Sequence, residues 1–160
     1  MIKNERLIIK SESRSNINLG LLSTCLLLFT FIISINPDIL MKSLFLSIQL
    51  SLSIPFFMGA IFARTKLAYA KNPQIWDKLG FIEFILGYGF LVNAIGIMME
   101  LLLTPLIGIL YFIVNILGAL IYSAMDIKSE GRNMKDRIYK DLFFILILIF
   151  LGILPALKIY

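Results

Sequence analysis

Histidine is missing from this sequence altogether, and cysteine occurs only once, as Cys25. Without histidine the chain lacks the usual side-chain ligand for haem, copper, zinc and non-haem iron. It also lacks the general base of Ser–His triads and of HExxH metalloproteases. A lone cysteine forms no intramolecular disulfide, and we interpret Cys25 as a small packing residue. The sequence therefore predicts no cofactor and no metal.

Charged residues are scarce as well. They make up 16% of the 160 residues, whereas 59% are hydrophobic and the mean hydropathy is +0.92. Soluble domains contain about 25% charged and roughly 45–50% apolar residues. Most of this chain lies in apolar stretches of about 20 residues, the length at which a helix crosses roughly 30 Å of hydrocarbon. We expect an all-α integral membrane protein with little chain left for a soluble domain.

Five such stretches are separated by polar or turn-forming segments. Asn36-Pro37-Asp38 and Thr104-Pro105 are typical turn or helix-start sequences. The predicted spans are 17–35, 39–63, 79–103, 105–125 and 142–159, with an N-terminal arm at 1–16 and polar loops at 64–78 and 126–141. The last helix has the loosest boundary, because its pattern also allows a start near Met134. The acidic and basic residues of 126–141 are interleaved, which favours a solvated surface.

Basic residues are distributed unevenly between the two sides of this topology. The arm and the two polar loops hold 13 of the 15 Lys and Arg residues, and the opposite side has only Lys42 and Lys158. The positive-inside rule then predicts a multi-pass protein of the cell membrane, with a cytoplasmic N-terminus and an outer C-terminus. It also accounts for the net charge of +5 without a nucleic-acid partner.

The third and fourth spans share a short pattern. Residues 90–96 and 112–118 both read Phe-x-Val-Asn-x-x-Gly, and Asn93 and Asn115 each lie eleven residues from Thr104. We predict a tight hairpin that brings the two asparagines to one depth. Their amides would either clamp the hairpin by bonding across it, or line a polar pathway. A similarity of only seven residues between two apolar segments can also arise by chance.

Helical spacing puts small and polar residues on the same faces as these asparagines. Small residues let helices approach closely, so these glycines are predicted packing positions. The packing glycines are Gly89, Gly96, Gly108 and Gly118, and the polar residues that share their faces are Glu100 and Tyr111.

The second span carries a row of small residues at every fourth position: Ser43, Ser47, Ser51, Pro55 and Gly59. Pro55 is expected to kink the helix, because proline removes a backbone N–H. The row would form either a wetted groove or, as we favour, a set of serines bonded back to their own helix. Gln49 and Ser53 form a second polar pair on another face.

Glu83 is the ionisable residue of greatest interest, since it falls about one turn inside the third span. It would pair with Lys78 or Arg64 at the interface, or point inward as a proton or cation site. Glu100 falls nearer the outer surface and is expected to be solvated.

The sequence also lacks the motifs of common membrane enzymes, such as clustered aspartates for Mg²⁺-pyrophosphate and glycine-rich phosphate cradles. We therefore expect a non-enzymatic subunit or homo-oligomeric module of a membrane assembly, with the bilayer, other subunits or further copies as partners. The leading alternative is a small ion or solute channel or transporter, with a polar route past Asn93, Asn115, Glu83 and the serine row of the second span. The candidate pathway residues are Asn93, Asn115, Glu83, Glu100, Tyr111, Ser47, Ser51 and Gln49. The third hypothesis is a lipid-active enzyme that uses Glu83.

Overall fold

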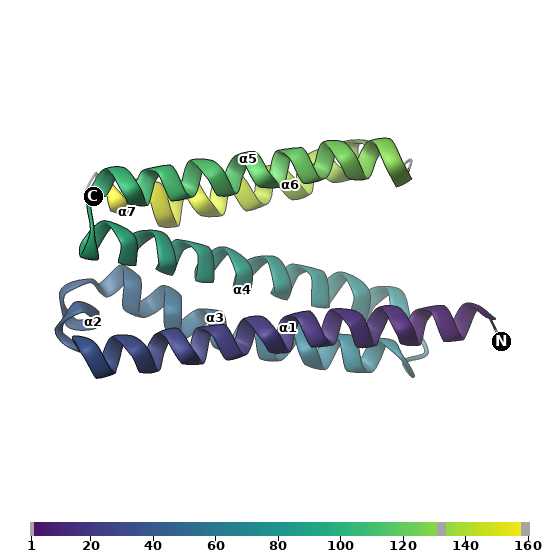
Figure 1. Ribbon diagram of the computed structural model, residues 1–160. Coiled ribbons are helices and arrows are strands. Elements are labelled where there is room, and N and C mark those ends of the chain that lie inside the picture. The colour runs from purple at the N-terminus through teal and green to yellow at the C-terminus, as the bar shows by residue number, and fades with distance from the viewer. Residues whose placement is uncertain (1, 131–133, 158–160) are drawn as a thin grey trace. The chain divides into compact units, whose positions relative to one another are not determined.

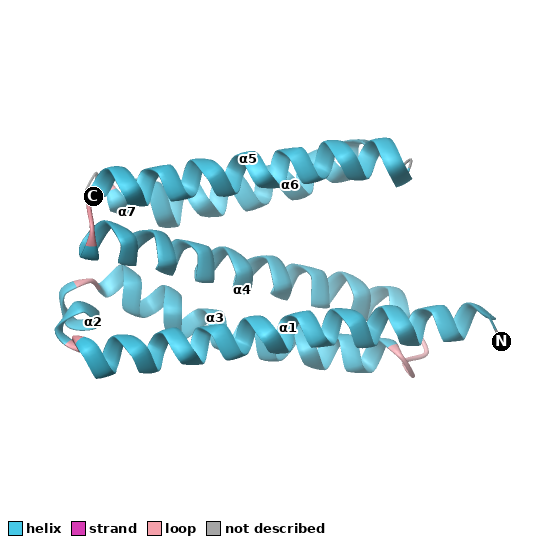
Figure 2. Ribbon diagram, viewed as in Figure 1, coloured by secondary structure: helices cyan, strands magenta, loops and turns pink. Residues whose placement is uncertain are grey.

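The computed structural model describes residues 2–130 and 134–157, and in these ranges all regular structure is helical (Figures 1 and 2). The elements are α1 (Ile2–Ile35), α2 (Asp38–Lys42), α3 (Leu44–Leu67), α4 (Pro73–Leu102), α5 (Pro105–Glu130), α6 (Met134–Leu148), the π-helical turn η1 (Ile149–Ile153) and α7 (Leu154–Ala156). Within the described part, five helical stretches are long and apolar enough to cross a membrane. The chain therefore has the character of a multi-pass membrane protein.

The chain divides into two compact units, residues 1–91 and 92–160. The first unit contains α1, α2, α3 and the beginning of α4. The second contains the end of α4, then α5, α6, η1 and α7.

Helix ends follow from local chemistry. α1 ends before Asn36-Pro37, because the residue before a proline is disfavoured in the helical region. α4 and α5 both begin at a proline, Pro73 and Pro105, whose missing N–H costs nothing in the first turn. Short loops join these helices (Figure 2).

The predicted second span is not one continuous helix. α2 ends at Lys42, and Ser43 adopts an extended conformation with φ −123° and ψ 97°. Its hydroxyl accepts a hydrogen bond from the Leu46 amide at 3.3 Å and so caps α3. Serine is a preferred N-cap residue, so Ser43 caps the start of α3 and does not lie within one continuous helix with the rest of the predicted row.

The helices extend into segments that the sequence assigns to the arm and the loops. Most of the polar arm belongs to α1, and α3 runs to Leu67 before α4 begins at Pro73. α5 continues to Glu130, and α6 begins at Met134, the early start that the sequence allows. Lys, Arg and Glu are good helix formers, so polarity alone marks the end of a hydrophobic span and not the end of a helix.

The core of the first unit is a helix pair, α1 beside α3 (Figure 1). α1 buries every seventh residue, namely Ser11, Asn18, Cys25 and Ile32. α3 buries a stripe with alternating steps of four and three, formed by Leu46, Leu50, Ser53, Phe57, Ala60, Arg64 and Leu67. This is the spacing of coiled-coil packing. α1 therefore contributes one buried row to this core.

In the second unit, the C-terminal helical segment of α6, η1 and α7 packs against α5, and α6 runs alongside α5 (Figure 1). Between α6 and α7 the helix widens into the π turn η1. Pro155 explains this change, because its ring would clash with the carbonyl of the residue four positions earlier in an α-helix. Such single π turns are often found at functional sites.

Candidate functional site

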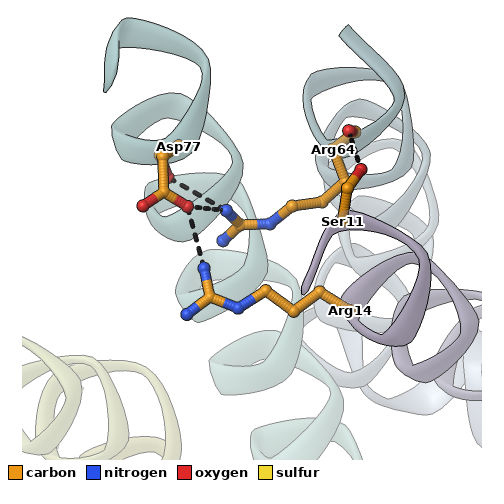
Figure 3. Close-up of polar contacts among 4 residues, drawn as sticks. All are labelled: Ser11, Arg14, Arg64 and Asp77. Atoms are coloured by element: carbon orange, nitrogen blue, oxygen red, sulfur yellow. Dashed lines mark hydrogen bonds and ion pairs between the residues drawn. The ribbon is translucent and has the colours of Figure 1, made fainter. Parts of the chain in front are cut away.

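One end of the first unit carries a charged cluster made by three helices (Figure 3). Asp77 of α4 binds two guanidinium groups through one carboxylate oxygen, Oδ1. Arg14 of α1 lies 2.8 Å from this oxygen, and Arg64 of α3 also bonds to it. Arg64 donates to the Asp77 carbonyl too, at 3.3 Å, and its own carbonyl accepts from the Ser11 hydroxyl. We call Ser11, Arg14, Arg64 and Asp77 the charged end.

The charged end matters for stability because its Arg64 side chain is buried. The Arg64 side chain is only 4% exposed, whereas that of Asp77 is 36% exposed. A buried charge without its partner is strongly destabilising, so Asp77 is required to hold Arg64 in place. The cluster joins α1, α3 and α4 at a common level.

Glu83 also belongs to the first unit and lies on α4, further along the helix than Asp77. Its carboxyl group faces Gly59 of α3 so closely that a Cβ at Gly59 would stand 2.6 Å from Oε1 and 2.7 Å from Oε2. Glu83 follows Asp77 by six positions, which correspond to about 9 Å along a helix, roughly a third of a hydrocarbon core of about 30 Å.

The predicted ion pair of Glu83 with Lys78 or Arg64 is wrong. Arg64 bonds to Asp77, and Glu83 Oε2 is buried without a hydrogen-bond partner among the residues that the structure describes. Of the two interpretations of Glu83, the structure favours the one in which it points inward.

Asn18 is a polar residue that the sequence analysis missed. It is 2% exposed, and its Nδ2 is buried with no hydrogen-bond partner in the described ranges. Its place in the buried row of every seventh residue was the signal that could have revealed it. A buried amide in a membrane helix faces protein, because an unsatisfied polar group in hydrocarbon is costly.

Further along the interface of α1 and α3, the polar contacts continue. Ser53 Oγ lies 3.2 Å from Cys25 Sγ and donates to the Leu50 carbonyl at 2.7 Å. Gln49, which the sequence predicts as a polar pathway residue, is 2% exposed. Cys25 is fully buried, in keeping with a small packing residue.

The predicted serine row does not act as one feature. Ser47 donates to the Leu40 carbonyl in α2 and not to its own helix. Ser51 and Pro55 are exposed, while Gly59 faces Glu83. The hypothesis of serines bonded back to their own helix is therefore wrong for Ser47.

In the second unit, Asn93 is fully buried and bonds to α6. Its Nδ2 donates to the Ile147 carbonyl at 3.3 Å, and its Oδ1 is buried without a partner in the described part of the chain. Asn115 donates instead to the Tyr111 carbonyl of its own helix at 2.9 Å. The predicted amide clamp between Asn93 and Asn115 is therefore wrong.

Phe112 is the residue that packs the end of α4 against α5 and η1. It is fully buried, and a Cβ at either Gly96 or Gly152 would overlap its ring. The ring thus fills the space left by two glycines. Neither Phe112 nor Gly152 was singled out as a packing residue by the sequence.

The other predicted residues of the hairpin have different surroundings. A Cβ at Gly108 would stand 2.9 Å from the Gly96 carbonyl oxygen and 3.1 Å from Glu100 Cβ, so Gly108 does bring two helices close together. Gly118 is exposed, with open space where a Cβ would stand. The packing role predicted for Gly118 is not seen in the described structure. Gly89 and Glu100 are buried and half-buried respectively.

A second polar cluster joins the C-terminal part of α5 to α6. Arg137 Nε donates to Ser123 Oγ at 2.7 Å and lies 3.7 Å from Asp141 Oδ1, and Nη1 lies 3.6 Å from Asp126 Oδ2. The guanidinium also stands 4.8 Å from the centre of the Tyr122 ring. Asp126 is 8% exposed, so the prediction of a solvated surface is wrong for these residues.

No group of three or more Cys, Asp or Glu side chains within the described ranges is placed to hold a metal ion. Comparison of the chain with family models, curated proteins and solved structures finds no match.

Proposed function

We propose that this chain binds and translocates a cation, either a proton or an alkali metal ion, and that Glu83 is the binding residue. The observation that carries the proposal is the half-buried Glu83 side chain, whose carboxyl group faces Gly59 and whose Oε2 is buried without a hydrogen-bond partner in the described structure. An ionisable side chain in a membrane span is costly, and such residues mark ion pathways and proton relays among other functional sites.

The surrounding polar groups support the same function. In the first unit, polar side chains recur along the interior from the charged end through Asn18 and Glu83 to Ser53 and Gln49. A proton or cation that enters such a bundle requires polar groups at intervals, since hydrocarbon offers none. The pathway predicted past Asn93 and Asn115 has less support, because Asn115 bonds to its own helix.

We also propose that the N-terminus and the charged end lie on the cytoplasmic side. The support is the placement of 13 of the 15 Lys and Arg residues on that side of the five-span topology, as the positive-inside rule requires.

Ion flux into liposomes tests the proposal. The purified full-length chain is reconstituted, an ion gradient and a membrane potential are imposed, and proton, Na⁺ and K⁺ movements are followed separately. Glu83→Gln should reduce the flux at least tenfold, while Glu100→Gln, the matched change at the other end of α4, should retain it. Equal flux in wild type and Glu83→Gln, or no flux of any of these cations in wild type, contradicts the proposal.

The second candidate function, a subunit or homo-oligomeric module, has a separate observation in its favour. The outer face of α1 has a shallow groove lined by Thr24, Leu27, Leu28, Thr30, Phe31 and Ser34. The hydroxyls of Thr24, Thr30 and Ser34 bond to carbonyls of their own helix at 2.8–3.0 Å. With its hydroxyls satisfied, this face fits a neighbouring membrane helix.

Obstruction of the groove tests this second candidate. Thr30→Trp should dissociate a complex isolated in mild detergent, whereas Leu26→Trp, an exposed position outside the groove, should leave the complex intact. A single monomeric species of the unmodified chain would refute the candidate.

A further inference from the structure

Asn18 of α1 and Glu83 of α4 lie at the same level of the first unit. Ser11 bonds to the Arg64 carbonyl, and Cys25 lies against Ser53. Asn18 is seven residues from both Ser11 and Cys25, and the midpoint between Arg64 and Ser53 falls at Met58 and Gly59. Because α1 and α3 run antiparallel with an even rise per residue, Asn18 stands at the level of Gly59.

Gly59 is also the residue that Glu83 faces, at 2.6–2.7 Å from the position of a Cβ to the carboxyl atoms. Asn18 and the Glu83 carboxyl group therefore come to one level of α3, at a residue that has no side chain of its own. Asn18 Nδ2 and Glu83 Oε2 are buried, and neither has a hydrogen-bond partner among the residues described. One is a donor and the other is an acceptor, so each supplies what the other lacks.

We infer that Asn18 and Glu83 form one proton-binding site beside Gly59, in which the unpartnered amide of Asn18 turns to donate a hydrogen bond to the carboxyl group of Glu83 when the proton binds. This inference rests on the ion-binding role proposed for Glu83. The proton binds to a carboxylate oxygen and converts the carboxylate to the neutral acid, so the step needs no other reactant.

The chemistry of the surroundings favours a proton over a metal cation. A bound metal ion must replace its hydration shell with several oxygen ligands. Asn18 and Glu83 together supply one amide and one carboxyl group, and the carbonyls of a helical backbone are engaged in their own hydrogen bonds. The nearest charged residues along the three helices are Arg14, Arg64, Asp77 and Lys78. Both arginines are bonded to Asp77 at the charged end, and Lys78 is exposed.

Infrared difference spectroscopy of the full-length protein in lipid tests the site. On acidification the wild type should gain the carbonyl band of a protonated carboxylic acid that is absent from Glu83→Gln. Asn18→Ala should move this band to higher wavenumber, because the carbonyl loses a hydrogen bond, whereas Asn16→Ala, at an exposed position of α1, should leave it in place.

A second variant keeps the test decisive if Asn18→Ala fails to fold. Gly59→Ala must push the end of the Glu83 side chain away and should shift the same band. Gly20→Ala, where a Cβ meets nothing within 4 Å, should not.

Three results would overturn the inference. They are a band that is insensitive to both Asn18→Ala and Gly59→Ala, a band that is present in Glu83→Gln, and a band that weakens at constant pH when choline is replaced by Na⁺ or Li⁺. The last result would assign the site to a metal cation and would leave the proposed transport function standing. A band that behaves as expected in a protein without flux would instead keep the proton site and reject transport.

Discussion

The space left by Gly96 allows the sharpest test of packing in the second unit. A Cβ at Gly96 would lie 2.7 Å from both Cε1 and Cε2 of Phe112, closer than real carbon atoms approach. The ring has no room to move, because Phe112 is fully buried and a Cβ at Gly152 would meet the same ring at 2.6 Å. Gly96→Ala is therefore an overpacking substitution.

The magnitude follows from two opposing effects. Overpacking a well-filled core costs roughly 1–3 kcal/mol, while replacing glycine by alanine inside a helix gains about 0.5–1 kcal/mol. Gly118→Ala has the same gain without the cost, because a Cβ at Gly118 meets open space. The difference between the two variants isolates overpacking, and we expect Gly96→Ala to be about 1–3 kcal/mol less stable than Gly118→Ala.

Reversible unfolding in mixed detergent micelles, followed by circular dichroism, measures this difference. Adding Phe112→Leu should recover part of the loss in Gly96→Ala, since the smaller side chain vacates the space, and the double-mutant cycle reports the coupling between the two residues. Equal stabilities of Gly96→Ala and Gly118→Ala would refute the assignment of Phe112 to the space between the two glycines.

Three other changes have defined outcomes. Asp77→Asn leaves the buried Arg64 without its carboxylate and should lower the free energy of unfolding by about 1–3 kcal/mol. This is less than the roughly 3–5 kcal/mol of a fully buried pair, because Asp77 is partly exposed. Unfolding experiments and the emission of the single tryptophan, which is next to Asp77, both measure the effect. Asn93→Leu removes the bond to α6 and should cost about 0.6–2 kcal/mol, whereas Asn115→Leu should change the free energy of unfolding little, as measured in the same unfolding assay. Cys25 should resist a water-soluble maleimide in the folded protein and react after unfolding, because its thiol is fully buried.

Each of these predictions has a result that contradicts it. Asp77→Asn with unchanged stability would mean that Arg64 finds another partner. Equal effects of Asn93→Leu and Asn115→Leu would restore the symmetric role that their matched sequence patterns suggest. Rapid labelling of Cys25 in the folded protein would show that the interface of α1 and α3 opens readily.

The candidate site was only partly predictable. Glu83 stood out because a carboxylate within an apolar span is rare, and the sequence left its direction open. Asn93 and Asn115 looked equivalent in sequence, with matched neighbours and equal distances from Thr104. Their partners differ because Ile147 lies beside Asn93, about fifty residues further along the chain, and no local pattern encodes that proximity.

The sequence by itself determined the helical class and the five apolar stretches, because backbone hydrogen bonds must be satisfied within each segment in hydrocarbon. Length, hydropathy and proline positions are local properties, so they can be read one segment at a time. Only the tertiary structure decided which polar side chains meet: the two arginines at Asp77, Glu83 over Gly59, and Phe112 in the space of two glycines. Those pairings depend on which helix faces which and at what register, and in lipid that choice is made by close packing and amide bonds instead of by hydrophobicity.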